Sequence, residues 1–261
     1  DHENYNFDTG MQVYESLSGH ENDRYEYNFP HYSYSTSMSN NFLRGTFDFS
    51  SDGDNVLNNT NILKTTINNN LSFSSIDYFS NLGFKNNFGL YLKNLNTIGK
   101  NHSVYKSNLQ SQLMSIFEVK SQFPLVKNSE KFNEKITPLV SFRLNPGQMK
   151  NLTSRGVNID NIFSINRLGL SEAYEKGKSL TLGLNYRKDN NVYIDDTLDE
   201  VEKYFEIKLA GVLRDVEENK ISTSTTLNRK ASNLFGSITN KLSDNFEIDY
   251  NFALDNDLTT F

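Results

Sequence analysis

The chain has 261 residues, a net charge of −6 and a sequence pI of about 5.3, and it contains no cysteine. The charge and the lack of a dense Lys/Arg block argue against nucleic acid as a partner, and the missing cysteines exclude disulfides and thiolate metal sites. Mean hydropathy is −0.61, and no apolar run approaches the ~18 residues of a membrane-spanning helix. The 19 Phe and 14 Tyr nevertheless argue against a uniformly disordered chain, because such aromatic residues have to be packed.

Alternation of apolar and polar residues is the main pattern along the chain. A period of two predicts β-strands. It appears, in chain order, over residues 43–49, 88–92, 113–119, 136–144, 179–186, 205–213, 234–242 and 246–254. Helix-period segments are nearly missing; the best candidate, 195–203, is short and acidic and is better interpreted as a loop.

Turn-forming residues separate these stretches. They include Asp52-Gly53, Asn145-Pro146-Gly147, Asn219-Lys220 and Ser243-Asp244-Asn245. Two connections look long, Lys127–Lys135 and Lys188–Glu202, and we expect both on one side of a membrane. At about 20 residues per strand and turn, the sequence predicts an all-β, antiparallel up-and-down meander of roughly 12 to 13 strands.

The two faces of the expected strands differ. Leu180, Leu182 and Leu184 share one face of the clearest strand and are expected to face lipid. The opposite face supplies these expected lumen-facing residues: Ser179, Thr181, Gly183, Asn185, Glu247, Asp249 and Asn251. On this view a Lys at Leu182 impairs assembly more than a Lys at Thr181, which is expected to stay hydrated.

A soluble β-sandwich alternates in the same way, with its apolar face in a core. Three observations favour a transmembrane barrel instead. The polar faces carry small and hydrogen-bonding residues, a dozen strands without helices is large for a sandwich, and Tyr and Phe gather at strand ends as in aromatic girdles.

A search for catalytic chemistry returns nothing. The four histidines, at 2, 20, 31 and 102, lack metal-ligand spacing, and no nucleophile elbow, P-loop or dinucleotide fingerprint occurs. Asp52-Gly53-Asp54 suits a turn better than a calcium loop. The acidic residues Asp195, Asp196, Asp199, Glu200 and Glu202 are interpreted as a solvated loop. We therefore expect no metal, no cofactor and no enzymatic activity.

Arg167 leaves two alternatives open. It follows an alternating run and precedes Glu172 and Glu175, which suits a strand-to-strand ion pair inside a barrel. An exposed arginine at a strand end fits the spacing equally well.

The same region carries a family resemblance. Residues 162–170 (Ile-Phe-Ser-Ile-Asn-Arg-Leu-Gly-Leu) and 175–186, with Asn166, Arg167, Glu175 and Gly177 at the motif positions, resemble a segment of the LptD (organic solvent tolerance) family of lipopolysaccharide-assembly proteins. Phe123-Pro124-Leu125 and 136–146 look like that family's preceding strand pair. The resemblance covers about residues 120 to 215. Ser171-Glu172-Ala173-Tyr174 departs from it, because many members carry an Asp-Arg pair there.

The resemblance implies a function. The chain would be a single segment, residues 1–261, from the middle of a large outer-membrane β-barrel, with the periplasmic N-terminal domain and the closing strands elsewhere. The intact protein would receive lipopolysaccharide from periplasmic bridge proteins and insert it into the outer leaflet, with an LptE-like lipoprotein plug in its lumen and outer-membrane lipid around it. The alternatives are a general porin or solute channel and a soluble β-rich structural or adhesin protein.

Overall fold

The computed structural model describes residues 5–17, 25–59, 61–149, 156–170, 172–190, 193–194, 197–198, 203–243 and 245–256. Fifteen strands are described: β1 (Tyr5–Glu15), β2 (Tyr25–Asn40), β3 (Gly45–Asn58), β4 (Ile62–Ser75), β5 (Tyr78–Phe79), β6 (Lys85–Lys100), β7 (Gln110–Gln122), β8 (Leu125–Asn128), β9 (Phe132–Asn145), β10 (Gly177–Asn190), β11 (Tyr193–Ile194), β12 (Thr197–Leu198), β13 (Lys203–Arg214), β14 (Leu234–Ser243) and β15 (Phe246–Leu254). One 3₁₀ turn, Thr223–Thr225, joins them. Across these ranges, no helix has the length and apolarity needed to cross a membrane.

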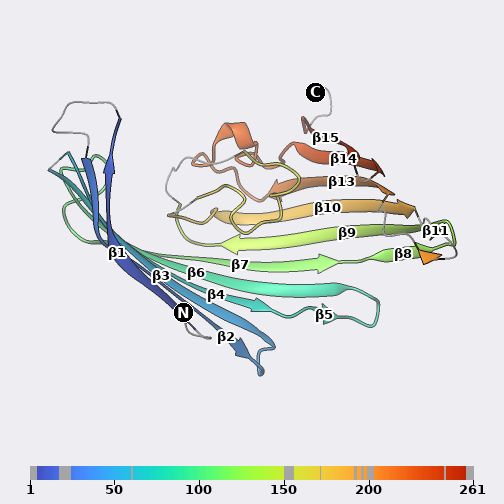
Figure 1. The fold of residues 1–261 in the computed structure, drawn as a ribbon, viewed down its shortest axis with the longest axis horizontal. Helices are drawn as coiled ribbons and strands as arrows, with labels where there is room; N and C mark the ends of the chain where they lie inside the picture. Colours follow the sequence, from blue (N-terminus) through green and yellow to red (C-terminus); the bar gives the residue numbers. More distant parts are fainter. Residues whose placement is uncertain are drawn as a thin grey trace. The chain divides into compact units, whose positions relative to one another are not determined.

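The strands follow one another as a meander. In the described part of the chain, 13 strands form one sheet in the order β1-β2-β3-β4-β6-β7-β9-β10-β13-β14-β15, with β5 beside β6 and β8 beside β9 (Figure 1). Every described pairing is antiparallel, as between β9 and β10. The predicted all-β antiparallel meander of about 12 to 13 strands is confirmed. An alternation of period two explains this fold, since it gives each strand two different faces.

The chain divides into two compact units. Unit 1 comprises residues 1–76 and 89–116, and unit 2 comprises residues 77–88 and 117–261. In unit 1, β3 and β4 pair without interruption from Gly45↔Ser75 to Asn58↔Ile62. In unit 2, β10 pairs along its full length with β9 on one side and, from Ser179, with β13 on the other.

Two long connections lie in unit 2, and neither was expected. The inner loops, as we name residues 146–176 and 215–233, join β9 to β10 and β13 to β14 (Figure 1). The alternating run before Arg167 is not a strand. Hydrogen bonds from Ile162 N to Asn158 O and from Ser164 N to Asn161 O form turns there instead.

The prediction of a long loop at Lys127–Lys135 is wrong. Leu125–Asn128 pairs with β9 from Leu125↔Ile136 to Asn128↔Asn133, which leaves a turn at 129–131. The charged residues of these strands give the segment the composition of a loop. Lys127 and Glu134 are nevertheless directly paired on β8 and β9, and Lys127 Nζ lies 3.8 Å from Oε2 of Glu134. The connection at Lys188–Glu202 is shorter than predicted, because Asn190 still pairs with Lys203.

Asp52-Gly53 is not a turn either, because it lies inside β3. Gly53 pairs with Tyr32 of β2, and a methyl group on Gly53 would collide with the Tyr32 ring. The glycine is therefore explained by close approach of an aromatic ring to the strand backbone.

Candidate functional site: a two-faced wall and a buried arginine–glutamate cluster

The strand register of unit 2 gathers the seven expected lumen-facing residues on one face, called the polar face below. Directly paired residues share a face of a sheet. One row runs from Asn185 to Lys208, then to Ser237 and Asn251 on β15. By alternation, Ser179, Thr181 and Gly183 join Asn185, and Glu247 and Asp249 join Asn251.

The polar face is covered at one end and open at the other. Ser179 and Thr181 on β10 are buried, with Thr181 at 0% exposure, whereas Glu247, Asp249 and Asn251 on β15 are exposed. The expectation that Thr181 is hydrated is therefore wrong. The first inner loop covers it, because Arg167 of that loop donates a 2.8 Å hydrogen bond to the Thr181 hydroxyl.

Arg167 and Glu175 form the centre of the covered end. The Arg167 side chain is 0% exposed, and its Nε and Nη2 lie 2.6 Å from the two carboxylate oxygens of Glu175. Nη2 also donates to the Ser179 hydroxyl at 3.0 Å. Of the two alternatives left open by the sequence, the ion pair is present and the exposed arginine is not. Its two partners lie in a loop and not on neighbouring strands.

Two further arginines complete the cluster. Arg214, at the end of β13, donates to Glu175 and to the carbonyl oxygen of Lys176. Arg143 on β9 pairs with Glu118 of β7 at 2.8 Å and donates to the Phe163 carbonyl of the first inner loop, also at 2.8 Å. Three buried guanidinium groups thus tie that loop to three strands.

The electrostatics of Glu175 follow from this arrangement. Burial by itself would raise the pKa of the Glu175 carboxyl, since the charged form loses water. The charges of neighbouring arginines and the hydrogen bonds from Arg167 outweigh burial and lower this pKa to about 2. Glu175 is therefore ionised at neutral pH.

Asn166 and Gly177 shape the loop at either side of the ion pair. The Asn166 side chain accepts a 2.8 Å hydrogen bond from Leu170 N and donates one of 3.0 Å to Leu170 O. Gly177 has φ +94°, and a methyl group there would lie 2.9 Å from Nη2 of Arg214. Both the backbone angle and the close guanidinium require glycine.

Sequence reasoning missed three members of the cluster: Glu118, Arg143 and Arg214. Each of them is next in sequence to an apolar residue of an alternating strand: Phe117, Phe142 and Leu213, respectively. Alternation therefore placed all three on the polar face of their strands, and this was the only sign of them in the sequence. Their mutual approach depends on the register, which pairs Glu118 with Arg143 and Arg143 with Ser179.

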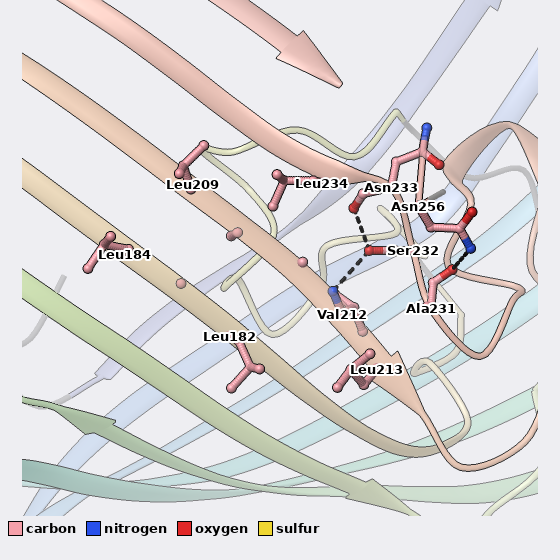
Figure 2. A pocket seen from close by; sticks show the side chains of 13 residues that line it. Leu182, Leu184, Leu209, Val212, Leu213, Ala231, Ser232, Asn233, Leu234 and Asn256 are labelled. Carbon is pink, nitrogen blue, oxygen red and sulfur yellow. Dashed lines mark hydrogen bonds between the residues drawn. The ribbon is translucent and has the colours of Figure 1, made fainter. Parts of the chain in front are cut away.

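The opposite surface of unit 2, the apolar face, is rich in exposed leucine. Leu182 and Leu184 are 43% and 41% exposed, and Val140 and Phe142 of β9 lie on the same face at 39% each. Figure 2 shows a groove on this face, bounded by Leu182, Leu209, Leu213 and Leu234 from three strands. The exposed apolar side chains of this face extend from Val140 on β9 to Ile238 on β14.

In unit 1, one face of the sheet carries a row of polar side chains that the sequence did not reveal. Neutral side chains on successive strands are hydrogen-bonded to one another: Tyr32 to Ser51 at 3.1 Å, Ser51 to Asn69 at 2.8 Å, Asn69 to Asn94 at 3.4 Å and Asn94 to Ser111 at 3.2 Å. Exposed Ile67 and Leu71 flank Asn69 on β4. Mutual hydrogen bonding reduces the cost of these groups on an apolar surface.

The contacts of these residues are structural, because they hold the first inner loop against the strands. Ion pairs and hydrogen bonds hold the cluster, and within the residues that the structure describes, no group of three or more His, Asp or Glu is placed to hold a metal ion. The five acidic residues of 195–202 lie outside the described ranges.

A comparison with models of known protein families identifies the family. The family model of LptD, described as LPS transport system D, matches residues 1–261, the whole of the chain given. No curated protein matches. The family consists of outer-membrane proteins of lipopolysaccharide transport and assembly, and it is not known as a family of enzymes.

Proposed function

The chain belongs to the LptD family, and from that premise we propose that its 261 residues form one segment of the wall of an outer-membrane barrel that inserts lipopolysaccharide into the outer leaflet. The observation that carries the proposal is the two-faced sheet of unit 2. Exposed apolar side chains, among them Leu182 and Leu184, lie on one face, and the seven residues from Ser179 to Asn251 share the other.

The polar face supports a role for the saccharide and phosphate parts of the lipid. Its exposed end on β15 carries Glu247, Asp249 and Asn251, and Asn251 donates a 2.7 Å hydrogen bond to Asp249. Such groups stay hydrated and exchange hydrogen bonds with sugar hydroxyls without covalent chemistry. Acyl chains would remain with the membrane on the apolar side.

The inner loops support a partly filled lumen. The described part of the first inner loop packs on the polar face of unit 2, where Arg167 and Arg143 fix it to the strands. We propose that the exposed β15 side of the polar face contacts an LptE-like lipoprotein plug. The periplasmic bridge proteins that deliver lipopolysaccharide are proposed partners of the intact protein.

Depletion of the intact protein tests the proposal. Surface lipopolysaccharide, measured by labelling whole cells, is expected to fall, and sensitivity to large hydrophobic compounds to rise. A general porin predicts slower uptake of small hydrophilic solutes with normal surface lipopolysaccharide. Normal labelling with impaired uptake would therefore overturn the assembly function and favour the porin.

A further inference from the structure

The first inner loop is fixed to three strands of the wall by buried charged groups. Arg143 of β9 donates to the Phe163 carbonyl oxygen at 2.8 Å. Arg167 of the loop donates to two hydroxyls of β10, and Arg214 of β13 donates to Glu175. The side chains of these three arginines are at most 2% exposed. Moving the loop off the wall would separate buried charged groups from their partners, which is strongly unfavourable.

The two ends of the loop are held together by Asn145, which is 1% exposed. Its side chain accepts a 2.8 Å hydrogen bond from Gly147 N, where the loop begins. The same side chain donates a 3.0 Å hydrogen bond to the Glu175 carbonyl oxygen, where the loop ends. A hinged lid needs end residues that can change their backbone angles. One buried side chain that binds both ends restricts such a change.

Apolar contacts fix the middle of the loop. Ile162, Leu168 and Ala173 are at most 1% exposed. The Phe163 ring lies directly on the backbone of β10, since a Cβ built on Gly183 would come within 2.6 Å of Cζ of the ring. Gly183 therefore provides the space that the ring occupies, and the wall and the loop fit each other at this point.

We propose that the first inner loop is a fixed strap, which stays on the polar face of β9 and β10 during transport and keeps the transported lipid away from Ser179, Thr181 and Gly183. The inference rests on the proposed function, because it concerns where the lipid passes. The alternative is a lid that moves off this face to admit lipid. The contacts favour the strap, since charged, hydrogen-bonded and apolar groups would all lose their partners in an open lid. Three of the seven expected lumen-facing residues thus brace the wall and do not line the route of the lipid.

Crosslinking of the loop to the wall tests the strap. Phe163→Cys and Gly183→Cys are introduced together into the intact protein, because the segment has no cysteine of its own. Dibromobimane then joins the two thiols, and transfer of lipopolysaccharide is measured in vesicles that contain the protein and its transport partners. A strap predicts the same rate of transfer before and after crosslinking. A lid predicts that crosslinking stops transfer, and that result would overturn the strap.

The matched control is the pair Lys178→Cys and Asp215→Cys. It crosslinks two exposed side chains that lie 3.9 Å apart in the native protein, outside the contacts of Phe163. Transfer should be unchanged there as well, which excludes an effect of the reagent itself.

Hydrogen exchange of residues 156–170 in the unsubstituted protein separates strap from lid without a transport assay. A strap predicts slow exchange at neutral pH that does not change when lipopolysaccharide is added. Fast exchange, or exchange that speeds up with the lipid, would overturn the strap. Absence of transfer by the unsubstituted protein would overturn the proposed function instead, and the exchange rates would still distinguish strap from lid.

Discussion

Arg167 and Glu175, eight residues apart in the chain, meet in a two-point ion pair whose Nε–Oε2 and Nη2–Oε1 distances are both 2.6 Å. The pair is buried, and the Arg167 guanidinium also reaches the hydroxyls of Ser179 and Thr181 on β10. It therefore joins a loop to the wall, and its removal should affect both.

Glu175→Gln should destabilise the folded barrel by about 3–5 kcal/mol, because it leaves buried guanidinium groups without their counter-charge. Unfolding by urea of the full-length protein in detergent measures the loss. The control is Lys178→Gln, whose exposed pair with Asp215 at 3.9 Å contributes about 0–1 kcal/mol. Equal losses for the two variants would contradict the central role of Glu175.

Acid should release the first inner loop over a defined pH range. The pKa of Glu175 is about 2 in the fold against an ordinary 4.5. A lowered pKa stabilises the fold above pH 4.5, and this contribution is lost as the pH falls toward 2. Hydrogen exchange of residues 156–170 should therefore speed up over this range in the wild type. In Glu175→Gln the exchange should be fast throughout, and a parallel pH dependence there would refute the assignment.

Gly177→Ala should destabilise the fold by about 1–3 kcal/mol, since a side chain at φ +94° is strained and the added methyl group approaches Arg214. Gly156→Ala is the matched control, because no atom lies within 4 Å of a Cβ there. Thermal or urea unfolding of both variants checks the difference. If Gly177→Ala left the free energy of unfolding unchanged, the backbone at Gly177 would not be constrained as described.

A charge on the apolar face should impair assembly more than one on the open polar face. Leu182→Lys places an ammonium group in hydrocarbon, at a cost of about 2–4 kcal/mol near the bilayer midplane. Asn251→Lys is the appropriate comparison, because Asn251 is exposed on the polar face whereas Thr181 is buried against Arg167. Folding yields in vesicles measure the effect, and equal yields would argue against membrane contact at Leu182.

The strands and their faces could be read from the sequence. Alternation is a local property, so it placed Leu182 and Leu184 opposite Thr181 and Asn185 without knowledge of any partner strand. The same reasoning failed at Lys127–Lys135, where charged residues that face each other across a tight turn have the composition of a loop.

Sequence therefore determined the meander, the two faces and, through the motif around Asn166-Arg167 and Glu175-x-Gly177, the family. Tertiary structure alone decided that the segment before Arg167 turns back over β10, because turns that pack on a strand face leave no periodic pattern. It also decided that Arg214, 39 residues beyond Glu175, reaches the same carboxylate, and that the Phe163 ring lies against Gly183 of β10. These features depend on strand register, which is set by pairing between residues distant in the chain.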